Sequence, residues 1–341
     1  MYESFYGLEA APFDVTPNPK YLLLTPAHSE ALHVLEYGVR ARKGIILLIG
    51  DAGTGKTTLL RTALAMRLAD GTRAGCIYIK NPKLSVSELY EHLATGCNMP
   101  YSATMSKPAL LKHLEESLTA LHQEGRHTAL IVDEAQALSD ELIEELRLLA
   151  NIESDDTKLL PLILAGQPEL AERLNEHKLR QFKQRIALRC ELPALEVKET
   201  AAYIFGRVRL VGGDASKMFT RDAVVSIHEG AKGIPRSISV ICDNALMTGF
   251  AMGKYLVDAQ IIEEVRRDLD LAKLDDTAKR EDGVEREDGQ PAAAGHSADQ
   301  NVADQNAADR TADRSADLSD TAESHVQEEV VVRASLSGSL G

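Results

Sequence analysis

The chain has 341 residues and carries 38 Lys and Arg against 52 Asp and Glu, which gives a formal net charge of −14. This length predicts about two domains, and an apolar share of 44% is enough for a substantial core. Aromatic residues make up 4% and Trp is absent, which argues against a platform that stacks single-stranded bases. The 4 cysteines are far apart in sequence, which excludes a zinc ribbon and a disulfide framework and fits a reducing cytosol.

The first predicted helix follows a proline-rich arm. Prolines stiffen residues 12–19, which we expect to be extended. Thr25 followed by Pro26 is typical of a helix start, because Thr can cap free backbone N–H groups and Pro fits the first turn. Apolar residues then recur at helical spacing up to Val39, so one face of this helix is expected to be buried.

Five short apolar segments alternate with helical patterns in the middle of the chain. They cover residues 45–49, 76–80, 129–133, 161–166 and 187–192. This alternation predicts an α/β domain in which a parallel five-stranded sheet is flanked by helices. Ser85, with a capping-box glutamate, and Ser139, before two acidic residues, mark two of the helix starts. No apolar run approaches the roughly 20 residues of a membrane span, so we expect no transmembrane segment.

The pattern changes after Pro193. Only helices are predicted from there, over residues 197–211, 221–229, 235–252 and 259–269, and they indicate a small all-helical domain. Residues 274–341 hold 16 acidic and 6 basic residues with an irregular Ala-Asp repeat, too few large apolar groups to form a core. The expected domains are therefore 1–194 for the α/β domain with the arm, 195–272 for the helical domain and 273–341 for a disordered acidic tail.

The first chemical motif is a P-loop. Residues 50–57 match the pattern G-x-x-x-x-G-K-[ST], and they follow an apolar strand and precede a helix. In this motif, backbone N–H groups surround the phosphates, Lys56 reaches the β- and γ-phosphates, and Thr57 is a ligand of Mg²⁺. The expected nucleotide-binding residues are Gly50, Asp51, Ala52, Gly53, Thr54, Gly55, Lys56, Thr57 and Thr58. The alternative is a glycine-rich turn with an exposed lysine, which the strand and helix around it disfavour.

Two acidic residues end the third apolar segment. We expect Asp133 to be a ligand of Mg²⁺ and Glu134 to orient or polarise the attacking water, because the two side chains point in different directions. The alternative is a solvated strand end. The fourth segment ends at Gln167, which we expect to sense the γ-phosphate, unless Gln167 and Pro168 simply start the next helix.

Arginines complete the candidate site. A cluster of basic residues precedes and enters the last predicted strand, and we expect one of its arginines to act on the phosphates of a neighbouring subunit. Arg185 is the first choice and Arg180 the second, and a solvated or DNA-facing patch is the alternative. Arg236, at the start of a helix in the helical domain, is expected to couple the nucleotide to domain movement, unless it is a surface residue.

Together these motifs resemble the AAA+ ATPases of the P-loop NTPase superfamily, over residues 1–270. That resemblance implies ATP and Mg²⁺ as cofactors and makes the helical domain a lid. Several stretches look like the ExeA-type branch, which includes general secretion pathway protein A and exopolysaccharide-associated ATPases. They are Phe5-Tyr6-Gly7-Leu8, Asp133-Glu134-Ala135-Gln136, Ala165-Gly166-Gln167-Pro168-Glu169-Leu170, Gln184-Arg185-Ile186 and Gly233-Ile234-Pro235-Arg236. Full-length secretion ATPases of this branch carry a membrane-spanning helix and a peptidoglycan-binding module where this chain has the acidic tail.

The resemblance implies an oligomeric ATPase that acts with a protein partner in the assembly or regulation of envelope secretion or exopolysaccharide export. Its expected location is the cytoplasm or the periphery of the inner membrane. The alternative is a DNA-binding AAA+ ATPase of the transposition or replication-initiator type, although the acidic balance disfavours strong DNA affinity. A third hypothesis is a nucleotide switch with negligible turnover, which the presence of Glu134 disfavours. The partner, the ring size and the role of the tail stay open.

Overall fold

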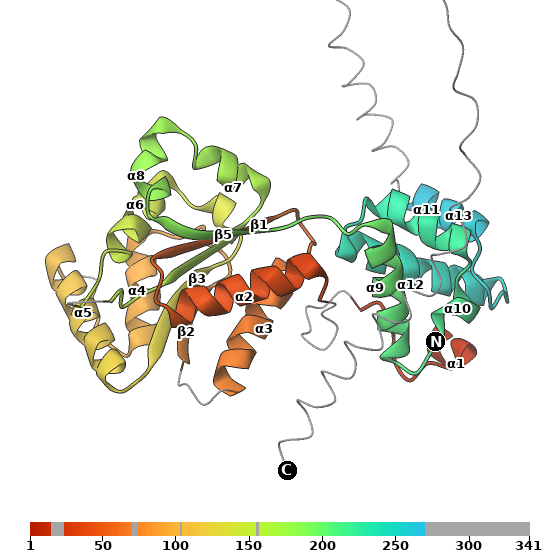
Figure 1. Ribbon diagram of the computed structural model, residues 1–341, viewed down its shortest axis with the longest axis horizontal. Coiled ribbons are helices and arrows are strands. Elements are labelled where there is room, and N and C mark those ends of the chain that lie inside the picture. Colours follow the sequence, from red (N-terminus) through yellow and green to blue (C-terminus); the bar gives the residue numbers. More distant parts are fainter. Residues whose placement is uncertain (15–23, 70–73, 103, 155–156, 270–341) are drawn as a thin grey trace, which may run out of the picture.

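The computed structural model describes residues 1–14, 24–69, 74–102, 104–154 and 157–269. Its centre is a five-stranded parallel sheet with the strand order β2-β3-β4-β1-β5. The strands are β1 (Ile45–Gly50), β2 (Ala74–Ile79), β3 (His127–Val132), β4 (Leu162–Gly166) and β5 (Ile186–Leu192). All five strands expected from the sequence are confirmed, with small shifts at their ends. Figure 1 shows this sheet domain on the left and a helical domain on the right.

Helices cover both faces of the sheet. One face packs against α2 (Pro26–Arg40) and α3 (Lys56–Ala69). The other face packs against α4 (Val86–Cys97), α5 (Lys107–Gln123), α6 (Asp140–Leu149), α7 (Pro168–Arg173) and α8 (Arg180–Lys183). Side chains of β1 alternate between the two layers, with Leu47 in the second and Leu48 in the first, because successive strand residues point to opposite faces.

The predicted helix starts are confirmed. The Thr25 side chain accepts a hydrogen bond from the backbone of His28, with Pro26 in the first turn of α2. Ser85 forms both halves of a capping box with Glu88 at the start of α4. Ser139 caps α6. These local side-chain contacts satisfy the backbone donors that a helix start leaves without partners in the helix.

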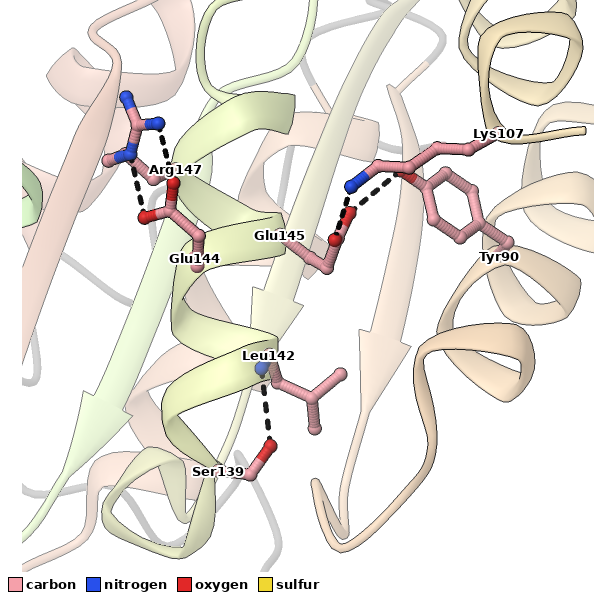
Figure 2. Close-up of polar contacts among 7 residues, drawn as sticks. All are labelled: Tyr90, Lys107, Ser139, Leu142, Glu144, Glu145 and Arg147. Atoms are coloured by element: carbon pink, nitrogen blue, oxygen red, sulfur yellow. Dashed lines mark hydrogen bonds and ion pairs between the residues drawn. The ribbon is translucent and has the colours of Figure 1, made fainter.

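Helix α6, which follows the acidic pair on β3, is fixed to its neighbours by a buried carboxylate. Glu145 is only 7% exposed, and it accepts hydrogen bonds from the Tyr90 hydroxyl at 3.0 Å and from the Lys107 ammonium at 2.5 Å. Figure 2 shows these two partners reaching it from one side, while Glu144 and Arg147 pair on the other face of α6. The buried contact thus joins the middle of α6 to α4 and α5.

The helical domain has a separate core. It contains α9 (Val197–Arg209), α10 (Ala215–Met218), α11 (Arg221–Ala231), α12 (Pro235–Ala251) and α13 (Ala259–Asp268). The four longer helices confirm the sequence-based prediction, whereas α10 was not expected. No described helix combines the length and the apolar character needed to cross a membrane.

The first residues of the chain join this helical domain, which differs from the expected division that placed them with residues 24–194. Helix α1 (Tyr2–Tyr6) buries Tyr2 and Tyr6 in the helical core, where it contacts α12, and Figure 1 shows it in the helical domain. The Tyr6 hydroxyl donates to the carbonyl of Leu246 at 3.2 Å, and Arg207 donates to the carbonyl of Pro12 at 2.6 Å. Aromatic rings and buried backbone acceptors therefore hold this segment against the helical domain. Residues 15–19 of the arm and the tail lie outside the described residues.

Candidate nucleotide-binding site

The P-loop connects β1 to α3 at the carboxyl ends of the strands. Gly53 and Gly55 have φ angles of +87° and +104°, in the region that favours glycine. A Cβ atom added to Gly53 would lie 2.8 Å from the Cβ of Arg236, so glycine is also required by close approach of the helical domain. The sequence motif therefore adopts the tight turn that its glycines predicted.

Lys56 is held inside this turn. Its side chain is 5% exposed, and its ammonium group donates to the carbonyl oxygens of Gly50 at 2.7 Å and Asp51 at 2.9 Å. Burial lowers the pKa of Lys56, and the carboxylates of Glu134 and Asp133 act in the opposite direction. A cation that lies against the loop backbone is suited to phosphate oxygens, and the alternative of an exposed lysine is excluded.

Two oxygen donors suited to Mg²⁺ meet beside the loop. The Thr57 hydroxyl donates to Oδ2 of the buried Asp133 at 2.7 Å, so helix α3 and strand β3 bring the two expected ligands together. Hydroxyl and carboxylate oxygens are hard ligands of the kind that Mg²⁺ takes in nucleotide sites, and the donor set fits this ion. The alternative of a solvated strand end does not apply to Asp133.

Tyr78 is a residue that sequence analysis missed. Its hydroxyl, on β2, donates to the same Oδ2 of Asp133 at 2.7 Å. Burial raises the pKa of Tyr78, and the neighbouring Asp133 carboxylate adds to that rise, so the phenol stays a donor. A single tyrosine in an apolar strand belongs to no sequence motif, so nothing in the sequence marks it as a site residue. Only the pairing of β2 with β3 places it beside the carboxylate.

Glu134 lies one residue beyond Asp133 but points elsewhere. It is exposed, with a φ of +53°, and its Oε2 accepts from the side-chain amide of Gln136 at 2.6 Å. The backbone N–H of Gln167 donates to Oε1 of Gln136 at 3.2 Å, and the Gln167 amide lies 3.5 Å from Oε2 of Glu134. The two expected residues therefore meet, with Gln136 as a link that the sequence did not assign.

The position of Gln167 is compatible with both of its sequence interpretations. It follows β4 directly and is also the residue before α7, where Pro168 occupies the first turn. Its side chain makes no helix cap, so it is available to Glu134. The start of a helix and a polar group at the sheet edge are thus compatible at one position.

Arg236 lies where α12 meets the P-loop. Its backbone N–H donates to the carbonyl of Gly53 at 3.3 Å, and its side chain is exposed. The structure therefore brings the helical domain to the loop at this residue, while its guanidinium faces solvent.

Arg180 and Arg185 lie away from the rest of the site. Arg185 is exposed and directly precedes Ile186, which pairs with Ile45 at the beginning of β1, whereas the P-loop follows the end of that strand. With 6 residues at about 3.3 Å each, β1 separates the two edges by about 20 Å. Arg180 is the exposed first residue of α8 and also lies before the start of β5 in the chain. Within one chain, neither arginine reaches the P-loop.

Comparison with known sequences matches this site to a family. The family described as "AAA domain" matches residues 39–174, which include the P-loop, the acidic pair and Gln167. General secretion pathway protein A of Aeromonas hydrophila is 39% identical over 257 residues, which cover 75% of this chain and 46% of that protein. The chain thus spans less than half the length of this relative.

Solved structures share the fold at low identity. The Aeropyrum pernix ORC2 protein, in complexes with ADPNP and ADP, matches with a TM-score of 0.57 and 18% identity, over 76% of this chain and 71% of that one. The Aeropyrum pernix ORC1 protein in complex with DNA matches with a TM-score of 0.56 and 15% identity, over 76% and 69%. At these identities the likeness concerns the arrangement of the helices and strands.

Proposed function

Because the chain belongs to the AAA+ ATPases of the general secretion pathway protein A type, we propose that it is an Mg²⁺-dependent, oligomeric ATPase that drives assembly or regulation of an envelope export system. The export system is for secreted protein or exopolysaccharide. One observation carries the catalytic part of the proposal. The buried Lys56, the Thr57–Asp133 pair and Glu134 lie together at one edge of the sheet.

Each of these groups has a task in ATP hydrolysis. Lys56 and the loop N–H groups bind the phosphates, and Thr57 and Asp133 would hold Mg²⁺, which neutralises charge on the β- and γ-phosphates when bound. Glu134 orients the attacking water and accepts its proton, because its carboxylate is exposed and projects from the end of β3. Gln167 reports on the γ-phosphate, since its amide already contacts Glu134.

The helical domain acts as a lid. Its contact with the P-loop runs through the backbone of Arg236, so rotation of the Arg236 side chain toward a bound γ-phosphate would tie the lid angle to the nucleotide. The first residues of the chain move with this lid, because Tyr2 and Tyr6 are part of its core.

The position of the arginines supports the proposal that the protein is an oligomer. Arg185, with Arg180 as the second choice, lies at the edge opposite the P-loop of its own chain. An arginine finger at this position serves the phosphate of a neighbouring copy. A ring or another nucleotide-dependent assembly supplies that neighbour.

The export role rests on the relative's name and on 75% coverage of this chain. A protein partner in envelope export, and a location in the cytoplasm or at the inner-membrane periphery, follow from the same likeness. The DNA-binding alternative draws on the fold likeness to the ORC1 protein in complex with DNA, which is 15% identical, and on the exposed basic residues Arg180, Lys183, Arg185 and Arg189.

The test separates these roles. Steady-state phosphate release with and without Mg²⁺ measures the ATPase, and absence of release would exclude turnover and favour a nucleotide switch. A Glu134→Gln variant, expected to hold ATP, is then applied to duplex DNA at several salt concentrations and to native extract, with ADP as the control. ATP-dependent retention of export components supports the proposal, and salt-sensitive DNA binding in its place would support the alternative.

A further inference from the structure

A buried histidine contacts the P-loop from outside the motif. His28, in the first turn of α2, is 4% exposed, and both of its ring nitrogens have polar partners. Nδ1 lies 2.8 Å from the hydroxyl of Thr25, and Nε2 lies 3.1 Å from the backbone carbonyl oxygen of Thr54. This is a polar contact between a helix of one sheet face and the phosphate-binding loop.

The partners determine the form of the ring. A carbonyl oxygen only accepts, so Nε2 of His28 carries the hydrogen and donates to Thr54. In the neutral ring Nδ1 is then an acceptor, and the Thr25 hydroxyl donates to it. Burial lowers the pKa of His28, which favours this neutral form, while the hydrogen bond to the Thr54 carbonyl and the Glu199 carboxylate on α9 oppose the effect.

The contact also determines the direction of a loop N–H. In a trans peptide the carbonyl and the next N–H are rigidly antiparallel. When His28 holds the carbonyl of Thr54, the N–H of Gly55 must point away from α2 and into the loop. Glycine at position 55 is favoured by its φ of +104°, while an added Cβ would lie 3.4 Å from Nε2 of His28, which is close to ordinary van der Waals contact.

We propose that His28 is a positioning residue of the nucleotide site, which turns the Gly55 N–H toward the phosphates by binding the Thr54 carbonyl. The inference rests on the proposed ATP site. Loss of the Nε2–H donor leaves the Thr54 carbonyl free to rotate, and the Gly55 N–H rotates with it. Binding of ADP and ATP should then weaken about tenfold, the effect of one hydrogen bond to a charged group.

Three substitutions in the full chain test it. Glutamine places an amide donor near the position of Nε2, so His28→Gln keeps the contact and binds Mg-ADP within about twofold of the wild type. His28→Asn lacks this reach, and His28→Leu has no donor, so both bind about tenfold more weakly. His33→Gln, on the exposed face of the same helix, is the matched control and binds normally.

Calorimetry measures the binding of Mg-ADP and Mg-ATP. The melting temperature, measured without nucleotide, shows whether each variant is folded. Weak binding by folded His28→Asn, with normal binding by His28→Gln, supports the inference. The inference is overturned if all His28 variants bind nucleotide as tightly as the wild type. It is also overturned if His28→Gln binds as weakly as His28→Asn, because His28 would then have only a packing role. If wild-type protein and the His33→Gln control also fail to bind, the proposed ATP site itself is wrong.

Discussion

The two edges of the sheet differ in how complete their chemistry is. At the carboxyl edge, the functional side chains contact one another within a single chain, as in the pairs Thr57–Asp133 and Glu134–Gln136. At the amino edge, Arg180 and Arg185 are exposed about 20 Å from the P-loop. In the proposed mechanism, the carboxyl edge binds the nucleotide within one chain, while the amino edge carries groups whose task requires a second molecule.

This difference predicts which steps an isolated subunit can perform. Nucleotide binding uses parts that the fold of one chain brings together, so it is expected in an isolated subunit. The proposed arginine finger places part of the turnover machinery at the opposite edge, so turnover is expected to depend on assembly. Substitutions at the two edges should therefore separate binding from hydrolysis.

The largest expected effect comes from the carboxyl edge. Lys56→Ala removes the buried cation and should abolish tight ATP binding, because the phosphates lose their charge partner. Glu134→Gln should keep binding and lower turnover by about 10²–10⁴-fold, since an amide cannot accept the proton of the water. Calorimetry and phosphate release measure the two effects. Normal hydrolysis by Glu134→Gln would contradict the catalytic assignment.

The amino edge is tested by Arg185→Ala. We expect ATP binding to an isolated subunit to stay unchanged and turnover of the assembly to fall by about 10³-fold, because an arginine finger acts on the neighbour's phosphate. Mixing this variant with Lys56→Ala should restore part of the activity. Some interfaces then combine an intact P-loop with an intact finger.

Matched variants separate a finger from general surface charge. Arg189→Ala removes an exposed arginine of β5, the strand that Arg185 directly precedes. The Arg189 side chain donates to Glu191 of its own chain at 3.0 Å, and its loss should leave turnover unchanged. If mixtures that demonstrably assemble stay inactive, Arg180 becomes the better candidate, and Arg180→Ala is the next test. Equal losses in Arg185→Ala and Arg189→Ala would indicate a diffuse basic surface.

A smaller effect is expected at Tyr78. Tyr78→Phe removes one of the two hydroxyl donors to Oδ2 of Asp133, so the carboxylate is less firmly oriented. The Mg²⁺ concentration for half-maximal turnover should rise about tenfold, as for other residues that support a metal ligand. Tyr37→Phe, at a side chain that is 55% exposed, is the control. An unchanged Mg²⁺ dependence in Tyr78→Phe would show that Thr57 alone orients Asp133.

The sequence predicted most of this architecture because its signals are local. Strand β1 is a run of apolar residues before a P-loop, and the start of α4 has a capping box within four positions. The contact of Tyr2 with Asp243 joins residues 241 positions apart, and no local pattern indicates it. Helix α10 has 4 residues, too few for a helical period to be visible.

The same reasoning applies to the site. Lys56, Thr57 and Asp133 belong to motifs whose spacing encodes their place, whereas Gln136 is an amide two positions beyond Glu134 without such a rule. His28 is a single polar residue near an apolar helical face. Its role depends on the packing of α2 against the P-loop, which is a property of the folded chain.

The smallest expected effect also concerns the carboxyl edge. It is the contribution of His28 to the loss of folding stability at acid pH. Burial lowers the pKa of His28 below its unfolded value near 6.5, so on acidification the unfolded chain takes up this proton first. The stability that neutral His28 contributes is complete above about pH 7 and is lost as the pH falls through 6.5 toward the lowered value. Melting temperatures of the wild type should therefore fall more between pH 7.5 and 5.5 than those of His28→Gln.

Two variants sharpen this comparison. Glu199→Gln removes the one carboxylate that favours the charged ring, so it should lower the pKa of His28 further and make the acid loss of stability larger than in the wild type. His33→Gln, on the exposed side of α2, should follow the wild-type curve. Parallel curves for the wild type and His28→Gln would mean that the ring exchanges protons in the folded state as it does in the unfolded chain, and that Nδ1 does not stay an unprotonated acceptor for the Thr25 hydroxyl.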